Sequence, residues 1–577
     1  MTIQEQLKER IRQERQRRAR FTDLDLLASI QAGRVQEAIE QLIFFTPPAQ
    51  FGASLAWLRP ALNARLATAN ANERERTLRF AAELALALAS FLPRWNLQDG
   101  YWGNGALSDA EIAAAAAAVR AWATTLAAAA PAAATDLLAA WRREAAARLK
   151  AEGVADPAAA AQELVGEAVH DYLDRLSAQV ARSSLRRIAE MRRNGRTRSE
   201  ISNDYAAFLP YTLYLGASFV TCNPTLVDIA WAIDPDLWTP TVDAIIAAHP
   251  QADAATLARL VTLEIVFANM RLLRPIFLLT EGEMGCVSLQ VNPQKHGDAP
   301  TMIADALAIY EELQARLDGG VPNVVFKLPA TRAGLEACRA LTARGIGVTI
   351  TVNFGLFQHL RFAEAIAEGH AIFSTLAHMS GRLAFPVRDE LLGKLDALAA
   401  HGIDEARARM AAAWSGVAVL KRLYALMAAR GYDFKRIRPL IASLRIYEGP
   451  LHAGLPSPFP DITEVVGTPI ITVFPNVRRA FDRADGIALT PTRIEEPVPP
   501  DVLDVLVHSE IFKQAYYVAD RAWAPAEEER FRPAYPLALE DEDAVAEWPP
   551  VRATLAEFSK SYDSLVQRIL ARQQALQ

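Results

Sequence analysis

The chain of 577 residues has little cysteine: Cys222, Cys286 and Cys338 are its only thiols, and they lie far apart. So few and so scattered thiols exclude a disulfide framework and a zinc cluster, and a reducing cytoplasm is the simplest compartment. A basic excess is also missing, because 61 basic residues face 67 acidic ones and the formal net charge is −6. That balance argues against a nucleic-acid-binding protein.

Long apolar runs are missing too. No stretch of about 18 apolar residues is free of charges, so we expect no helix that spans a membrane. The stretch from Ala113 to Ala134 comes closest, and Arg120 and Pro131 interrupt it. The first residues, MTIQEQLKERIRQERQRRARF, are polar and lack the apolar core of a secretory signal. The chain also has no HExxH, GxSxG, GxGxxG or Walker motif, so we expect neither a metal nor a cofactor.

The chain changes character near residue 195. Before that point it is rich in Ala, Leu, Arg and Glu, and segments such as 111–130 and 161–193 read as helices. Ser108 and Glu111 stand where a capped start of the first of these helices is expected. We therefore predict an Ala-rich helical N-terminal extension over 1–195. We predict a second domain over 196–577, a barrel with a C-terminal helical segment.

After residue 195, short apolar runs of strand length alternate with longer helical patterns. The runs are 216–224, 286–293, 323–331, 347–354, 371–380, 440–446 and 468–475, with a weaker eighth candidate around 200–205. Mostly apolar strands suit a parallel sheet that is buried on both faces. The pattern predicts an α/β fold, a (β/α)8 TIM barrel. A doubly wound open sheet is the alternative, but its usual Gly-rich phosphate loop is absent.

Polar residues stand at or near the carboxyl ends of six of these strands. They are Asn223, Gln290, Lys327, Thr351, Arg382 and Arg445. In a (β/α)8 barrel those ends form one mouth, where active sites lie. We therefore expect these side chains to converge on one cavity.

Lys327 lies inside the apolar run VVFKLP. Burial disfavours the ammonium form and lowers a lysine's pKa, and a neutral amine can attack a carbonyl group to form a Schiff base. The alternative is a strand-end lysine whose stem reaches solvent.

Other residues admit both a functional and a structural interpretation. Arg382 and Arg445, with nearby serines, suit a phosphate dianion, or each arginine pairs with a carboxylate. Asp204 and Asn223 could supply acid–base and hydrogen-bonding groups, or they are turn and cap residues. Thr349 and Thr351 alternate with apolar residues and should face the same side of their strand.

Six motifs, in order, resemble those of the transaldolase family of Schiff-base aldolases. They are TCNPTL (221–226), VSLQVNP (287–293), VFKLPAT (325–331), TITVNFGLFQ (349–358), SGR (380–382) and ASLR (442–445). The resemblance places Lys327 on the Schiff-base lysine and Asp204 on the general acid–base aspartate. It places Thr351 on the threonine that holds the catalytic water. Asn223, Thr221 and Thr349 fall in the sugar-binding motifs, and Arg382, Ser443 and Arg445 fall on the phosphate-binding set.

The resemblance also shows departures. Gln290 stands where transaldolases have a catalytic glutamate, Thr349 where they have asparagine, Ala377 where they have serine, and Met379 where they have an aromatic residue. Gln290 and Ala377 are similar to the related fructose-6-phosphate aldolases, which release free dihydroxyacetone. An amide hydrogen-bonds but cannot move protons as a carboxylate does.

The resemblance implies a transferase that moves a dihydroxyacetone unit between sugar phosphates, as from sedoheptulose 7-phosphate to glyceraldehyde 3-phosphate in the pentose phosphate pathway. A lyase that releases dihydroxyacetone, and a degenerate barrel that only binds sugar phosphates, are the alternatives. We expect sugar-phosphate substrates and neither nucleic acid nor a membrane as partners. The sequence allows a homo-oligomer but does not determine the oligomeric state. It also leaves open the role of the extension.

Overall fold

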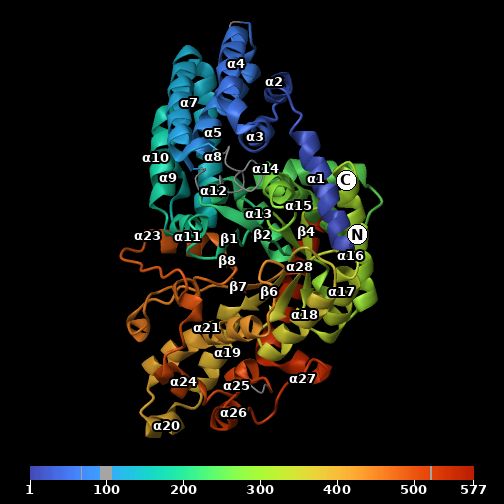
Figure 1. Ribbon diagram of the computed structural model, residues 1–577, viewed down its shortest axis with the longest axis vertical. Coiled ribbons are helices and arrows are strands. Elements are labelled where there is room, and N and C mark those ends of the chain that lie inside the picture. Colours follow the sequence, from blue (N-terminus) through green and yellow to red (C-terminus); the bar gives the residue numbers. More distant parts are fainter. Residues whose placement is uncertain (67, 91–106, 520–522, 577) are drawn as a thin grey trace.

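A computed structural model describes residues 1–66, 68–90, 107–519 and 523–576. The described chain is helical from Ile3 to Arg193, and most of these helices stand at one end of the molecule, whereas the first of them lies against the barrel (Figure 1, blue to teal). They are α1 (Ile3–Arg18), α2 (Asp23–Gln31), α3 (Val35–Glu40), α4 (Pro48–Leu66), α5 (Ala71–Ser90), α7 (Asp109–Ala129), α8 (Pro131–Ala151), α9 (Pro157–Val165), α10 (Val169–Arg182) and α11 (Ser184–Arg193). The predicted cap of α7 is confirmed, because the Ser108 hydroxyl accepts the Glu111 N–H.

By length and hydropathy alone, α7 is the one helix among the described residues that could cross a membrane. Here it packs against α5, α8 and α10, and 33% of its most apolar window is buried. The expectation that nothing spans a bilayer stays a prediction.

Eight parallel strands form a closed barrel in which each strand pairs with the next and β1 pairs with β8. The strands are β1 (Glu200–Asn203), β2 (Ala217–Thr221), β3 (Val287–Gln290), β4 (Val324–Pro329), β5 (Val348–Asn353), β6 (Ser374–Met379), β7 (Ile437–Ala442) and β8 (Ile470–Val473). The predicted barrel is therefore confirmed, including the weak first strand. Nearly every strand residue is buried, as expected when helices cover a parallel sheet.

Helices follow the strands around the barrel. They are α12 (Leu209–Tyr214), α13 (Pro224–Ile233), α14 (Pro235–Ala248), α15 (Ala254–Leu279), α16 (Ala299–Arg316), α17 (Arg332–Thr342), α18 (Leu356–Glu368), α19 (Ser380–Leu392), α20 (Leu395–Leu398), α21 (Glu405–Ala429), α22 (Pro460–Thr463) and α23 (Pro475–Arg483). The long connections after β2 and β6 hold several helices each, because they are too long for one crossover.

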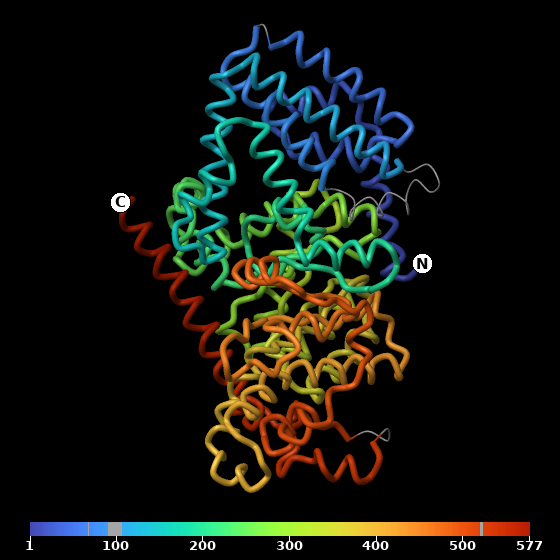
Figure 2. Tube along the Cα trace, turned by 90° about the vertical axis from the view of Figure 1, so that its left-hand side faces the viewer, coloured from blue at the N-terminus to red at the C-terminus, as the bar shows by residue number. Residues whose placement is uncertain are grey.

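A C-terminal segment follows, with α24 (Pro500–Leu506), α25 (Glu510–Tyr516), α26 (Pro525–Phe531), α27 (Glu542–Glu547) and α28 (Pro549–Ala575). Figure 2 shows α28 in red, running obliquely along one side of the molecule. It contacts β5 and α19 at one side of the barrel, and α13 and α15 at the other. The last helix therefore crosses the carboxyl ends of the strands.

The helical extension is fastened to the barrel by buried contacts. Phe44 and Trp141 of the extension share one hydrophobic cluster with Phe219 and Phe373, which belong to the barrel. The buried Glu152 carboxylate accepts hydrogen bonds from Arg148 and Arg478, both at 2.8 Å, and so joins α8 to α23. The extension and the barrel thus share apolar core and buried charge.

Candidate active site

A cavity of about 530 Å³ opens at the carboxyl ends of the strands. Eight of the residues that the sequence singled out line it: Asp204, Thr221, Asn223, Lys327, Thr351, Arg382, Ser443 and Arg445. Three of them lie in the strands β2, β4 and β5, four lie in the loops that follow β1, β2 and β7, and Arg382 lies in the first turn of α19. The expected convergence of these side chains on one mouth is thus observed, apart from Gln290.

Lys327 projects from β4 and is 6% exposed. No hydrogen bond or ion pair to its ammonium group is found among the residues that the structure describes. Burial lowers the pKa of Lys327, and the negative charge of Asp204 opposes part of that shift. A buried amine with a lowered pKa, facing a cavity, has the properties that a Schiff-base nucleophile needs.

Asp204 follows β1 and is held by a neighbouring strand. The Thr221 hydroxyl donates a hydrogen bond of 2.6 Å to its Oδ1 atom, and Val473 accepts its backbone N–H. Asn223 caps α13, because its Oδ1 accepts the Leu226 N–H at 2.9 Å. The cap and the cavity are compatible roles, since capping occupies only the carbonyl oxygen of the amide.

Two arginines form a cationic end of the cavity. The Arg445 backbone N–H donates to the buried Asp461 carboxylate at 3.0 Å, and the Ser380 hydroxyl donates to the same carboxylate. Ser443 has a positive φ of 63°, an unfavourable conformation for a residue with a Cβ atom. A Cβ atom on Gly381 would lie 2.3 Å from the Ser443 carbonyl oxygen, so the close approach of these two loops requires glycine there.

Two predicted residues lie elsewhere. Thr349 is fully buried below the cavity, where its hydroxyl accepts a hydrogen bond from Thr375 at 2.9 Å. Gln290 lines a neighbouring cavity of about 380 Å³, together with Asp305 and Tyr562. The structure therefore does not bring Gln290 or Thr349 into the lining of the Lys327 cavity.

Two of the four positions that depart from the transaldolase motifs do line the cavity. Ala377 and Met379 of β6 are both in the lining. The Thr351 hydroxyl lies 3.5 Å from the Met379 sulfur and donates to it. His378 points elsewhere: it is buried against His359, and burial lowers its pKa to about 3. His378 is thus a neutral structural residue.

Two residues of α28 complete the mouth, and the sequence interpretation missed both. Glu557 forms a two-pronged ion pair with Arg382 at 2.5 Å. The buried Phe558 ring lies 5.9 Å from the Lys327 Nζ atom and 5.4 Å from the Arg382 guanidinium carbon. The amphipathic pattern of 549–575 predicts a helix, but nothing in that pattern says which cavity the helix covers.

Comparisons with known proteins point to one family. A family model described as Transaldolase/Fructose-6-phosphate aldolase matches residues 202–496, about half of the chain. A transaldolase of Neisseria meningitidis serogroup C (strain 053442) is 31% identical over 206 residues, which cover 32% of this chain and 55% of the relative. "Transaldolase 2" of Nostoc sp. PCC 7120 is 28% identical over 202 residues, which cover 33% of this chain and 49% of the relative. A transaldolase of Arthrobacter sp. FB24 is 28% identical over 274 residues, which cover 44% of this chain and 68% of the relative. The chain thus spans about half the length of the first two relatives, and the extension and α28 lie outside the family match.

Proposed function

The chain belongs to the transaldolase/fructose-6-phosphate aldolase family, and on that premise we propose that it transfers a dihydroxyacetone unit between sugar phosphates through a Schiff base on Lys327. The observation that carries the proposal is the buried Lys327 amine, which has a lowered pKa and faces a cavity with Asp204 and two arginines. Three buried, unpaired cysteines fit a reducing cytoplasm.

The proposed reaction begins when the neutral Lys327 amine attacks the C2 carbonyl of a ketose phosphate. Loss of water gives an imine. Asp204 then takes the proton of the C4 hydroxyl, the C3–C4 bond breaks, and its electron pair moves into an enamine on the bound three-carbon unit. The phosphorylated aldehyde leaves. An acceptor aldose phosphate reacts with the enamine in the reverse sequence, and water finally releases the product from Lys327.

Arg382 and Arg445 supply the binding site for the substrate phosphate in this proposal. Burial and the neighbouring positive charge of Arg382 lower the pKa of Arg445, so a bound anion would stabilise the charged form of its guanidinium group. The Glu557 carboxylate already holds Arg382 by two hydrogen bonds. A phosphate dianion would take the place of that carboxylate, because both present paired oxygens to the guanidinium fork.

Whether water reaches the enamine decides between transfer of the dihydroxyacetone unit to an acceptor and its release. Phe558 covers Lys327 and restricts access of solvent to the enamine, and Thr351 donates its hydroxyl to sulfur in place of water. Both features favour a transferase. Ala377 favours the second candidate, a lyase that releases dihydroxyacetone, because the family's serine hydroxyl is missing from the cavity wall.

Borohydride trapping with fructose 6-phosphate, followed by peptide mass spectrometry, tests the proposal. We expect a reduced three-carbon adduct on Lys327. An acceptor assay with erythrose 4-phosphate or glyceraldehyde 3-phosphate then separates transfer from release of dihydroxyacetone. If the folded protein binds the sugar phosphate and forms no adduct, the Schiff-base proposal is refuted. The alternative of a barrel that only binds sugar phosphates then remains.

A further inference from the structure

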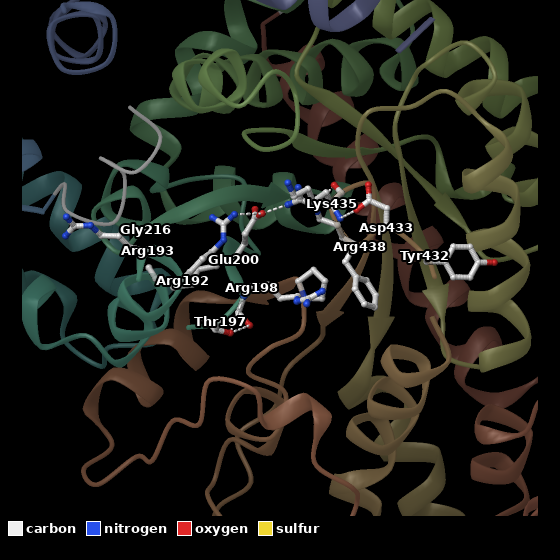
Figure 3. A pocket seen from close by; sticks show the side chains of 15 residues that line it. Arg192, Arg193, Thr197, Arg198, Glu200, Gly216, Tyr432, Asp433, Lys435 and Arg438 are labelled. Atoms are coloured by element: carbon white, nitrogen blue, oxygen red, sulfur yellow. Dashed lines mark hydrogen bonds and ion pairs between the residues drawn. The ribbon is translucent and has the colours of Figure 1, made fainter. Parts of the chain in front are cut away.

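A second and larger cavity lies at the opposite end of the barrel. It has a volume of about 720 Å³ and is formed where the strands begin, between the end of α11 and the segment that leads into β7 (Figure 3). Neither the family motifs nor the proposed reaction uses it. Its volume falls in the range of about 300–1,000 Å³ that is usual for small-molecule sites.

The lining of this cavity is strongly basic, although the chain as a whole is acidic. Five basic side chains and two acidic ones line it, an excess of three positive charges. Glu200, one of the two acids, is fully engaged: Arg438, Arg192 and the Ser218 hydroxyl all donate to its carboxylate. Asp433, the other, accepts the backbone N–H of Lys435. The Glu200 carboxylate is therefore used within the protein itself, whereas the exposed Asp433 carboxylate is only partly used, by one backbone N–H.

Three cations remain with unused hydrogen-bonding capacity. Arg192 reaches Glu200 and the Met284 sulfur through Nη2 alone, which leaves its other two nitrogens available. Arg198 stacks on the Phe434 ring, 5.2 Å from its centroid, and pairs with no carboxylate of the described chain. Lys435 is exposed, and its ammonium makes no ion pair within the described residues.

We propose that this cavity, at the amino ends of the strands, binds a phosphorylated small molecule through Arg192, Arg198 and Lys435. Arginine is suited to this ligand, because its planar fork of donors matches the oxygens of a phosphate. Arg198 is already held in place by stacking, so its donors lose little conformational freedom on binding. A cavity of about 720 Å³ has the size of a small metabolite.

The ligand would join the extension to the barrel. Arg192 belongs to the last turn of α11, whereas Arg198 and Lys435 belong to the segments that enter β1 and β7. The next residue, Arg193, forms an ion pair with Asp109 at the start of α7. Binding should therefore stabilise the folded chain as a whole, because a ligand that binds only the native state raises its stability.

Calorimetric titration of inorganic pyrophosphate tests this proposal. The full-length protein carries Arg382→Ala and Arg445→Ala, so that the active-site mouth no longer binds phosphate. We expect one site per chain and a rise in melting temperature. Arg198→Ala with Lys435→Ala should then weaken binding by at least roughly tenfold, as expected for the loss of charge-assisted hydrogen bonds. Arg196→Ala, an exposed neighbour outside the lining, should leave affinity unchanged.

Several outcomes would overturn the proposal: no pyrophosphate binding to the mouth-disabled chain, equal weakening by Arg196→Ala, or tighter binding of citrate than of pyrophosphate. Circular dichroism establishes that each variant is folded. Trapping at Lys327 in the variant carrying only Arg198→Ala and Lys435→Ala should equal that of the unmodified protein. Failure of the Schiff-base proposal would abolish trapping in both proteins and leave the titration result unaffected, so the two failures are distinguishable.

Discussion

Lys327 stands where an apolar side chain would serve stability better. Lys327 is buried within β4 without a hydrogen-bonded carboxylate in the described structure, and burial lowers its pKa. Such a group contributes reactivity at a cost in folding free energy. The physical conflict between an apolar strand and a central lysine is therefore itself a functional signal, and it was readable from the sequence.

Lys327→Met should abolish trapping and turnover while the free energy of unfolding stays equal or rises. The pKa of Lys327 is below the 10.5 of an unperturbed lysine, so the unfolded chain binds more protons than the folded one between those two values. Stability of the unmodified protein should therefore increase with pH across that window, and the variant should lose this increase. Urea unfolding at several pH values measures both effects. Lys560→Met, at an exposed position, is the control, and residual turnover in Lys327→Met would contradict the assignment.

Arg445→Ala should raise KM for phosphorylated substrates far more than for unphosphorylated ones. The expected loss is about 1.5–3 kcal/mol, because a hydrogen bond to a charged group disappears. Steady-state kinetics with fructose 6-phosphate and fructose provide the comparison. Arg388→Ala removes a nearby arginine that pairs with Asp389 outside the cavity, and it should change neither constant. An equal effect of Arg445→Ala on both sugars would exclude a phosphate role.

Most of the candidate site could be predicted from residue order, because the carboxyl ends of parallel strands meet at one mouth. It was harder to predict how deep in the barrel each strand residue lies, and therefore whether its side chain reaches the cavity. Thr349 and Thr351 do alternate with apolar residues, but Thr349 lies deeper and its hydroxyl is used by Thr375. Gln290 follows the same strand-end rule, yet it lines the cavity formed with Tyr562 of α28. Its surroundings depend on a helix far away in the sequence.

Among the secondary-structure elements, α28 contributes most that the sequence could not foresee. Helix formation at 549–575 follows from local composition, but its path across the barrel mouth depends on tertiary packing. The family match ends at residue 496, so no motif extends to Glu557 or Phe558. These two side chains connect α28 to the chemistry, one through Arg382 and the other through Lys327.

Glu557→Gln should lower KM for phosphorylated substrates, because substrate phosphate no longer has to displace a carboxylate from Arg382. The Glu557 side chain is 50% exposed, so the ion pair contributes at most about 1 kcal/mol and the change in KM should be about fivefold or less. Glu547→Gln, which removes an exposed partner of Arg552, is the matched control. A rise in KM would mean that Glu557 assists binding.

Phe558→Ala should shift the reaction from transfer towards release of free dihydroxyacetone. The ring covers Lys327, and its removal admits water to the enamine. Product analysis with and without acceptor aldose phosphate measures the partition. The variant also loses a buried aromatic side chain, so its stability should fall by about 3–5 kcal/mol. Phe558→Leu, which keeps apolar cover, should retain more transfer, and an unchanged partition in both variants would argue against a role in water exclusion.

For the molecule as a whole, the predicted division into an extension over 1–195 and a barrel over 196–577 stays a prediction. The extension is helical and the barrel closed, as expected, but buried contacts join them. Arg274 of α15, 1% exposed, donates to Glu14 of α1, with 3.0 Å between Nε and Oε1. Sequence patterns predict helices and strands, but they do not show which charged residues far apart along the chain form ion pairs.

Glu152→Gln tests whether extension and barrel are one cooperative unit. The substitution leaves the buried guanidinium groups of Arg148 and Arg478 without their carboxylate, and breaking a buried pair costs about 3–5 kcal/mol. We expect that loss in urea unfolding, with the helical and barrel signals still changing in a single transition. Glu167→Gln, whose partner Arg142 is paired at the surface, should cost less than about 1 kcal/mol. A separate early transition of the helical signal alone would show that the extension folds and unfolds independently, as the sequence division at residue 195 implies.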